Sequence, residues 1–423
     1  MAGRRIFSFP HNDAFVSSLK ISDMNKIGFY AGSFDPFTRG HLSIVCEALC
    51  LFDKVIVGIG SNPSKRPVFD LSERQSMIRQ TFEDWQDSFR YCRPVYLSCS
   101  EARACARLRE DPSCIEIVAF EGLTIDAAIK AGADTLIRGE RIIGDHDSEM
   151  QLSMLNRDLL AARHCYLNMV TIPVPKESLT YVSSSTVKSL FACGEYIAAY
   201  RFVTPSVHNA MCRKYLRGEF PSGHFLNAVS ESCGEKVYDE HVVRSYCAGN
   251  RCYHNLSHIG YCLNYLNFLR NTGKAEFADF DALKLALFFH DIVNGVAASE
   301  EKSAAVLRAL QPDHQPETDK LFEDAARLIM NTRHDSQQCS DCSEDAKLLH
   351  DVDLLILADD ENYDTYAGLI AREYSSACSR EAYVSGRRDF LSRLLKSDIF
   401  RHPLFKKFEA AAKSNLKREL FGY

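Results

Sequence analysis

The sequence predicts an α/β protein in which a parallel β-sheet wrapped by helices is followed by an all-helical domain. From residue 26 to about 194, short apolar runs rich in β-branched residues alternate with segments of helical period. After about residue 202, segments of helical period follow one another without strand signals. A chain of 423 residues, 46% of them hydrophobic, is long enough for about two or three globular domains.

Five apolar runs are predicted as strands of the sheet, at residues 27–34, 55–60, 115–120, 135–138 and 166–174. The segment from about 83 to 112 is rich in Cys and Arg and interrupts the alternation, so we interpret it as an insertion. Residues 1–25 lack a convincing targeting signal and are interpreted as an N-terminal extension. The first domain is therefore predicted at residues 26–216.

The second domain is predicted at residues 224–423, after a linker at 217–223 that contains Gly218, Pro221 and Gly223. Its helices are expected at 259–269, 282–293, 300–310, 320–330, 345–357, 363–397 and 407–420.

Composition argues against two classes of partner. The net charge is −6 and no basic stripe is present, which disfavours a nucleic-acid partner. No apolar run approaches the ~20 residues that a membrane span needs.

The 16 cysteines are scattered through apolar segments, as expected for free thiols in the reducing cytoplasm. Cys339 and Cys342 lack the further ligands of a zinc site and are expected in a loop.

The first predicted strand runs into Gly32-Ser-Phe-Asp-Pro-Phe-Thr-Arg-Gly-His41 and then directly into a helix. Thr38 and His41 share the first helical turn, where free backbone amides and the helix dipole favour an anion. A phosphate bound there would meet a hydroxyl and an imidazole. The segment is neither a Walker loop nor the dinucleotide glycine pattern. Taken alone, it is also compatible with an ordinary junction that carries a surface histidine.

Further polar groups follow other predicted strands. Lys65 and Arg138 fall at the carboxyl edge of the sheet, where α/β proteins bind ligands, and Arg141 follows one short turn later. Ser183, Ser184 and Ser185 precede a helix and offer hydroxyls to a second anion. Two cations and two helix starts at one edge suit a triphosphate donor and a phosphate acceptor.

These segments, with Asn62-Pro-Ser-Lys65, Glu149-Met-Gln151, Asn156-Arg157 and Tyr181-Val-Ser-Ser-Ser-Thr-Val-Lys188, resemble phosphopantetheine adenylyltransferase. That family belongs to the T/HxGH nucleotidyltransferase superfamily, whose domain is Rossmann-like, and the similarity runs from about residue 26 to 215. The resemblance implies adenylyl transfer from ATP, with Mg²⁺ on the triphosphate, to 4′-phosphopantetheine. The products would be dephospho-coenzyme A and pyrophosphate, in coenzyme A biosynthesis. The resemblance also leaves open a homo-oligomer formed through this domain.

The resemblance implies a role for each matching residue. The catalytic groups would be His41, Lys65 and Arg138. The acceptor would be held by Ser33, Thr38, Lys65, Thr124, Arg138 and Asn156. ATP would be held by Ser33, Phe34, His41, Arg141, Glu149, Ser183, Ser184 and Ser185.

Three departures from the family pattern bear on the acceptor. Ser148 replaces an aromatic residue, Glu140 replaces an apolar one, and the insertion at 83–112 lies just before the acceptor-side loop Gly122-Leu-Thr124. The alternatives are a nicotinate or nicotinamide mononucleotide adenylyltransferase, or a binding module without activity. The mononucleotide enzymes carry His in place of Thr38 and lack the Asn-Pro-Ser-Lys element.

The helical domain contains Tyr253-His-Asn-Leu-Ser-His258, Phe288-Phe-His-Asp291 and His350-Asp-Val-Asp353. His254 and His258 are four residues apart and are expected on one helix face. His290 and Asp291 follow a very apolar run, and a divalent metal would compensate a buried charged pair there. Mn²⁺, Fe²⁺, Zn²⁺ and Mg²⁺ all suit these ligands.

This series resembles the HD superfamily of metal-dependent phosphohydrolases across residues 224–423. The resemblance implies His254, His290, Asp291 and Asp353 as metal ligands. His258, Lys302 and His334 would contact a phosphate or a second metal, and Asp351 would be a supporting partner or a surface acid. The sequence therefore predicts a bifunctional enzyme. The alternative for its second half is a regulatory module that binds a nucleotide.

Overall fold

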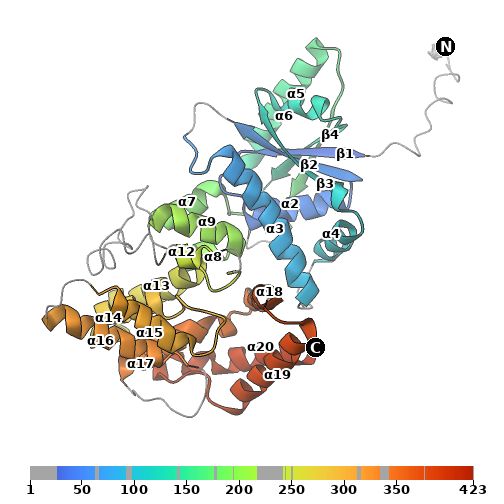
Figure 1. The fold of residues 1–423 in the computed structure, drawn as a ribbon. Coiled ribbons are helices and arrows are strands. Elements are labelled where there is room, and N and C mark those ends of the chain that lie inside the picture. Colours follow the sequence, from blue (N-terminus) through green and yellow to red (C-terminus); the bar gives the residue numbers. More distant parts are fainter. Residues whose placement is uncertain are drawn as a thin grey trace, which may run out of the picture.

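The structure is a computed structural model, and it assigns helices and strands over most of the chain. It describes residues 26–61, 66–91, 98–140, 143–175, 179–193, 195–216, 242, 244–248, 251–311, 316–333, 343–375 and 377–422. An α/β part with a twisted sheet stands above an all-helical part, and α7–α9 lie between the two (Figure 1).

The α/β part is built on five parallel strands in the order β3-β2-β1-β4-β5. The strands are β1 (Ile27–Gly32), β2 (Lys54–Ser61), β3 (Ile115–Glu121), β4 (Thr135–Glu140) and β5 (Asn168–Pro173). All five predicted strands are confirmed, with ends that differ by a few residues. The chain winds outward from β1 in both directions, so the crevice between β1 and β4 is the topological switch point where α/β sheets bind ligands.

The sheet is covered on both faces, because its side chains alternate between two hydrophobic clusters. Phe29 of β1 packs in a cluster with Ile125 of α5 (Thr124–Lys130) and Leu160 of α6 (Ile143–Ala162). The next residue, Tyr30, packs in the other cluster with side chains of α2 (Arg39–Leu49) and α3 (Leu71–Tyr91). The result is a three-layer arrangement of helices, sheet and helices.

The segment expected as an insertion begins inside a helix. α3 runs unbroken past residue 83, and α4 (Cys99–Glu110) and the short 3₁₀ helix η1 (Pro112–Cys114) follow it. Arg107 of α4 donates to the carbonyl oxygens of Leu49 (2.7 Å) and Phe52 (2.5 Å), which ties α4 to the end of α2.

Three helices connect the sheet to the helical part: α7 (Ser184–Ala192), α8 (Tyr196–Tyr200) and α9 (Pro205–Leu216). α9 packs on α13 (Leu256–Asn271), where His208 Nδ1 lies 2.7 Å from the Ser257 hydroxyl. The two helices approach closely because Gly260 has no side chain, since a Cβ there would lie 3.3 Å from Cys212 Sγ. One hydrophobic cluster runs from Tyr30 to Leu416, so the two parts of the chain pack on each other. The linker predicted at 217–223 lies outside the described residues, and the domain boundaries stay a prediction.

Helices make up the rest, and the described residues after β5 contain no strand, in agreement with the predicted all-helical second half. The predicted helical region at 363–397 forms two helices, α18 (Tyr363–Ser375) and α19 (Arg380–Lys396), and the Ser379 side chain caps α19 by accepting from the Ala382 amide. The elements are α12 (Arg244–Tyr246), α13, α14 (Phe280–Phe289), α15 (Ser299–Ala309), α16 (Pro316–Met330), α17 (Glu344–Asp353), η5 (Leu354–Ala358), α18 (Tyr363–Ser375), α19 (Arg380–Lys396), η6 (Pro403–Phe408) and α20 (Glu409–Gly422).

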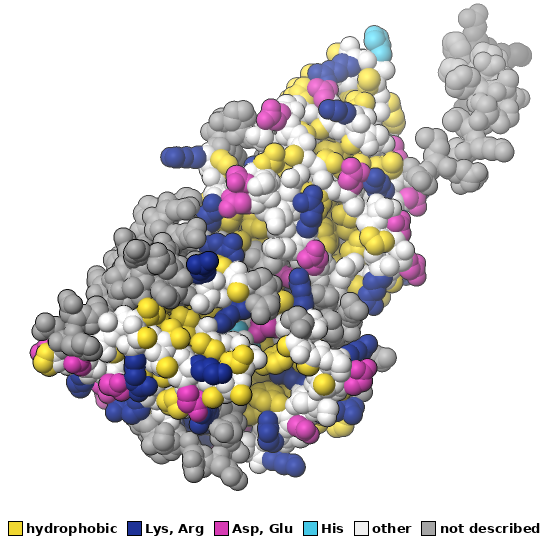
Figure 2. All heavy atoms as spheres, viewed as in Figure 1, with side chains coloured by type: hydrophobic (Ala, Val, Ile, Leu, Met, Phe, Trp, Pro, Cys, Tyr) yellow, Lys and Arg dark blue, Asp and Glu magenta, His cyan; other side chains and the backbone are white. Residues whose placement is uncertain are grey.

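The surface mixes charges of both signs. On the face drawn in Figure 2, Lys and Arg side chains are interspersed with Asp and Glu rather than gathered into a single patch. Among the described helices, none is both long enough and apolar enough to cross a membrane. The cysteines in the described ranges are free thiols, as the sequence predicted.

Candidate active sites

The turn that follows β1 is held rigidly. Its Phe34 has a positive φ of 48°, and a Cβ at Gly32 would lie 2.7 Å from the Phe34 ring, so only glycine fits there. The buried Asp35 carboxylate accepts hydrogen bonds from the backbone N–H groups of Val68 and Phe69, each at 3.0 Å. The turn is therefore fastened to the segment that leads into α3.

Two further contacts fasten the same turn. Arg74 of α3 donates to the carbonyl oxygens of Ser33 (2.8 Å) and Gly60 (3.4 Å), which joins the carboxyl ends of β1 and β2. The Ser184 hydroxyl of α7 donates to the Pro36 carbonyl at 2.8 Å. The first turn of α7 therefore lies directly beside the turn after β1.

The imidazole of His41 is oriented by the residue that caps its own helix. The backbone N–H of Thr38 donates to His41 Nδ1 at 3.0 Å, and the Thr38 hydroxyl lies 3.1 Å from the same nitrogen. Because the amide can only donate, Nδ1 must accept, which leaves the ring proton of a neutral imidazole on Nε2. The rings of Phe34 and Phe37 pack against the imidazole at 5.1 and 5.4 Å between centroids.

His41 faces a pocket of about 250 Å³ at the switch point of the sheet. The pocket brings together seven of the residues expected to bind ATP or the acceptor: Ser33, Phe34, His41, Arg138, Ser183, Ser184 and Ser185. The first turns of α2 and α7 both open onto it, and amides in a first turn lack intrahelical partners. Two helix N-termini and one guanidinium make the pocket suitable for a polyphosphate.

Other expected residues lie apart from this pocket. Thr124 begins α5 and Asn156 lies on α6, and neither lines the pocket. Asn156 Nδ2 is buried and has no hydrogen-bond partner in the described part of the chain. Lys65 and Arg141 lie outside the described residues, as does the side chain of Glu149.

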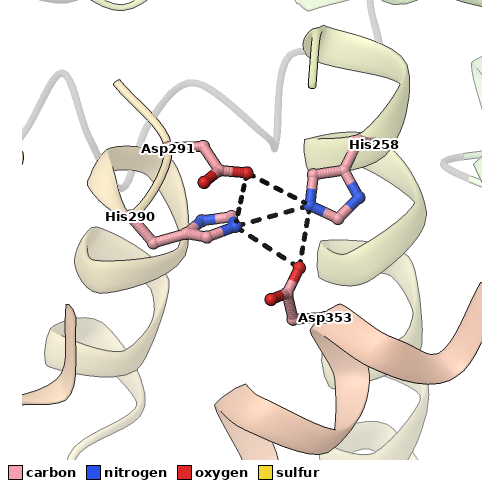
Figure 3. A group of neighbouring side chains, drawn as sticks. All are labelled: His258, His290, Asp291 and Asp353. Atoms are coloured by element: carbon pink, nitrogen blue, oxygen red, sulfur yellow. Dashed lines mark hydrogen bonds and ion pairs between the residues drawn. The ribbon is translucent and has the colours of Figure 1, made fainter. Parts of the chain in front are cut away.

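A second group of polar side chains lies in the helical part, where His258, His290, Asp291 and Asp353 point toward one another (Figure 3). Each offers one ligand atom, and these atoms all lie within 4.8 Å of one another. Asp353 Oδ1 is 3.1 Å from His258 Nε2, and Asp291 Oδ2 is 3.1 Å from His290 Nε2. The two Nε2 atoms are 3.4 Å apart. Three of the four expected ligands belong to this group, with His258 in place of His254.

The donor set suits a divalent cation. His290 Nδ1 donates to the Leu287 carbonyl at 2.7 Å, which leaves Nε2 as the ring nitrogen that faces the group. Two imidazoles and two carboxylates are a common set of ligands for Mn²⁺, Fe²⁺ or Zn²⁺.

The histidines of this group lower the pKa of its two carboxyl groups. Burial disfavours ionisation of Asp291, but the charges of His290 and His254 outweigh it and hold the pKa of this carboxyl below its usual range. The pKa of Asp353 is lowered in the same way, because hydrogen bonds from His258 and His290 outweigh its burial. Both carboxylates therefore stay ionised in a buried place, which a cation would stabilise.

His254 lies at the edge of this group and has a partner of its own. Its Nδ1 is 2.6 Å from the Glu373 carboxylate, and its Nε2 is 4.0 Å from Asp291 Oδ2. The expectation that His254 and His258 share a helix face is wrong, because Asn255 caps α13 and the helix begins only at Leu256. His254 therefore precedes the helix, outside its first turn.

The sequence reasoning missed two supporting residues. Glu373 of α18 accepts from the backbone N–H groups of Tyr253 (2.8 Å) and His254 (3.1 Å) as well as from the His254 ring. Arg251 donates to the carbonyl oxygens of Asp291 (2.6 Å) and Ile292 (2.7 Å) and so holds the segment after α14. An acid inside the apolar run of α18 was the available signal for Glu373, whereas no local pattern marks Arg251.

His254, Asp291 and Asp353 line a cavity of about 400 Å³. Much of the remaining wall is aromatic or aliphatic, and it includes Tyr253, Tyr366, Tyr374, Tyr383 and Phe390. A small organic molecule could thus place one end at the carboxylates and the rest against tyrosine rings.

Two other expected residues, Lys302 and Asp351, do not line this cavity. Lys302 is exposed on α15 and does not line it, and His334 lies outside the described residues. Asp351 is buried and turns away, since its carboxylate accepts from the backbone N–H groups of Arg401 (2.8 Å) and His402 (2.6 Å).

Known proteins are similar to the α/β part. The family model described as cytidylyltransferase-like matches residues 29–189. Phosphopantetheine adenylyltransferases of Francisella philomiragia and Francisella tularensis subsp. novicida are each 31% identical to the chain over 193 residues. That stretch is 45% of this chain and 98% of each relative.

A solved structure of Plasmodium falciparum nicotinic acid mononucleotide adenylyltransferase complexed with NaAD covers 47% of this chain and 98% of its own. Its sequence identity is 16% and its TM-score 0.26, which is too weak a likeness to bear on the acceptor. The curated relatives, in contrast, are matched over nearly their whole length. The chain therefore belongs to the phosphopantetheine adenylyltransferase family, and its N-terminal α/β part is a nucleotidyltransferase domain.

Proposed function

We propose that the α/β part transfers the adenylyl group of ATP to the phosphate of 4′-phosphopantetheine, forming dephospho-coenzyme A and pyrophosphate. The observation that carries this proposal is the His41 ring, fixed by Thr38 at a pocket that Arg138 and the first turn of α7 also line. The acceptor is suggested by the names of the relatives and by the Asn62–Lys65 motif.

The chemistry requires alignment and charge neutralisation more than a strong base. An oxygen of the acceptor phosphate attacks the α-phosphorus of ATP, and the bond between that phosphorus and the bridging oxygen breaks to release pyrophosphate. The acceptor phosphate is already ionised at neutral pH, so it needs no base. His41 Nε2–H is placed to donate to an α-phosphate oxygen as negative charge develops there. Mg²⁺ bound with ATP would neutralise part of the triphosphate charge.

Lys65, Arg141 and Glu149 complete the proposed site by their match to the family motifs. Lys65 would hold the acceptor phosphate together with Ser33, while Arg141 and Glu149 would hold ATP. Thr124 and Asn156 would contact the acceptor beyond its phosphate. The test is formation of dephospho-coenzyme A and pyrophosphate by purified protein with Mg²⁺, ATP and 4′-phosphopantetheine. Failure to form these products would overturn the proposal.

We also propose that the helical part is an HD-type metal-dependent phosphohydrolase. The observation that carries this second proposal is the convergence of His258, His290, Asp291 and Asp353, whose two carboxylate residues also line the 400 Å³ cavity. These four residues would hold the metal, which would supply Lewis-acid polarisation of a phosphoryl oxygen.

His254 would then face the substrate rather than the metal. Glu373 accepts a hydrogen bond from His254 Nδ1, so Nε2 is the ring nitrogen that faces Asp291. A histidine in that position can hold a substrate phosphate or give a proton to the leaving oxygen.

The second activity is tested with the metal-loaded protein and a panel of phosphate esters, with and without a chelator. Release of phosphate that stops on chelation supports hydrolysis. If the protein binds nucleotides tightly but releases no phosphate from any ester, the helical part is a regulatory module instead.

A further inference from the structure

Arg39 joins the adenylyltransferase segment to the helical part. It stands between Thr38 and Gly40, at the first position of α2. Its Nε donates to the Val203 carbonyl at 3.0 Å, and its Nη2 donates to Oδ1 of Asn362 at 3.1 Å. Asn362 is 323 residues further along the chain, so this contact depends on how the two parts pack.

The side-chain amide of Asn362 is oriented so that its oxygen accepts from Arg39. Its side chain is buried directly before α18, and its Nδ2 donates to the Asp359 carboxylate at 2.9 Å. Its backbone N–H also donates to that carboxylate, at 3.2 Å. Because Nδ2 already has an acceptor, the amide is oriented with Oδ1 toward the guanidinium of Arg39.

The charge of Arg39 is compensated from the same side. Burial lowers the pKa of the Arg39 guanidinium, and Tyr200 and Asp359 oppose that shift. An arginine remains cationic even so, and a partly buried cation needs acceptors. The helical part supplies both an acceptor, Asn362 Oδ1, and a nearby carboxylate, Asp359.

The first turn of α2 is therefore held at its backbone and at this side chain. The backbone N–H of Arg39 donates to the Phe202 carbonyl at 2.8 Å. Thr38 and His41 belong to the same turn, and the Thr38 N–H must lie 3.0 Å from Nδ1 to orient the imidazole. A shift of this turn would move the Nε2–H donor, and a misplacement of about 1 Å costs roughly 10²-fold in rate.

We propose that Asn362 is a positioning residue for adenylyl transfer, because it holds the first turn of α2, and with it the His41 ring, through Arg39. This inference rests on the proposed adenylyl transfer. It makes the helical part a component of the adenylyltransferase site rather than an independent appended unit.

A neighbouring contact provides a matched control. Arg201 and Glu361 form an exposed ion pair at 4.0 Å between the same two parts of the chain. Glu361 is adjacent to Asn362 in the sequence, but its ion-pair partner lies outside α2, and its charge acts on Arg39 less strongly than that of Asp359. Exposed pairs contribute little to stability, so Glu361→Ala removes an inter-part contact without loosening the His41 turn.

The test is a double-mutant cycle on the full-length protein with Arg39→Gln, Asn362→Ala and the double variant. Each single variant should lower kcat for dephospho-coenzyme A formation by about tenfold and leave the KM for ATP within about twofold. The double variant should lose no more than either single variant, because both remove one contact. Glu361→Ala should retain wild-type kcat.

Metal content of the helical part is measured on every variant and should stay unchanged, which separates positioning from general unfolding. Equal kcat in Asn362→Ala and Glu361→Ala would overturn the proposal. So would additive losses in the cycle, or a loss of kcat that only accompanies loss of metal.

A second readout does not need turnover. In protein labelled with ¹⁵N-histidine, the His41 signals, assigned with a His41→Gln variant, should report an unprotonated Nδ1. Asn362→Ala should mix the two ring tautomers, whereas Glu361→Ala should not. If the wild-type protein makes no dephospho-coenzyme A, the proposed function fails. The histidine spectra then still show whether Asn362 positions His41, because they do not depend on turnover.

Discussion

The backbone N–H of Thr38 lies 3.0 Å from His41 Nδ1, so the residue that caps α2 also decides which ring nitrogen carries the proton. His41→Ala should therefore lower kcat for adenylyl transfer by roughly 10²–10³-fold, the scale of losing one transition-state donor. ATP affinity should change little, because Arg138 and the serines of α7 remain in the pocket. Single-turnover kinetics and calorimetry with ATP measure the two quantities.

The matched control for that change is His164→Asn, at an exposed histidine beyond the end of α6 with a φ of 54° that asparagine tolerates. It should keep wild-type turnover. A His41→Ala protein that turns over at nearly the rate of this control would make His41 an ordinary junction histidine.

Glu373 should support phosphate release by orienting the His254 ring. Its carboxylate accepts the Nδ1 proton of His254 at 2.6 Å, which keeps Nε2 directed at Asp291. Glu373→Gln should reduce phosphate release by about 10–100-fold, the usual cost of losing a residue that orients a reactive histidine, while bound metal stays at the wild-type level. Ser375→Ala, at the exposed end of α18, is the control and should change neither.

Substitution by glutamine should remove the bound metal at His258 but not at His254. His258 Nε2 lies 3.1 Å from Asp353 and 3.4 Å from His290 Nε2, within the converging group, whereas His254 lies at its edge. His258→Gln should lose bound metal and, with it, hydrolysis. His254→Gln should keep the metal and lose only turnover. Metal analysis by mass spectrometry on both purified variants decides, and metal loss in His254→Gln alone would reverse the two roles.

Asp351 should prove to be a stabilising residue rather than a ligand. Its fully buried carboxylate accepts from the backbone N–H groups of Arg401 and His402 and lies 3.0 Å from His350 Nδ1. Asp351→Asn should lower the free energy of unfolding by about 2 kcal/mol, because hydrogen bonds to a charged acceptor weaken. Chemical denaturation measures this, with the exposed Asp360→Asn as control. Loss of metal from folded Asp351→Asn protein would contradict the assignment.

Much of the fold could be predicted because it follows from local periodicity. The five strands and the helices from α13 onward appear where apolar spacing placed them, since a buried face imposes its period on the sequence. The break between α18 and α19 was missed because the polar stretch around Ser379 reads as helix surface until its capping bond is seen.

The sites could be predicted only in part, because spacing along the chain does not specify which side chains converge. His290 and Asp291 were identified from their apolar context, and the pocket at His41 from its turn and helix. The choice between His254 and His258 depended on where α13 begins, and Asn255 was the capping signal that local reasoning passed over. The roles of Asn362 and Glu373 could not be predicted, although Glu373 stands out as an acid in an apolar run, because their partners are more than a hundred residues away.

Adenylyl transfer to 4′-phosphopantetheine is tested by a competition assay with full-length protein, labelled ATP and Mg²⁺, and equal concentrations of 4′-phosphopantetheine and nicotinamide mononucleotide. We expect the label almost entirely in dephospho-coenzyme A, with one pyrophosphate released per adenylyl group transferred, and His41→Ala should abolish most of this transfer. Label in the dinucleotide instead, or no transfer to either acceptor, would rule out the proposed reaction.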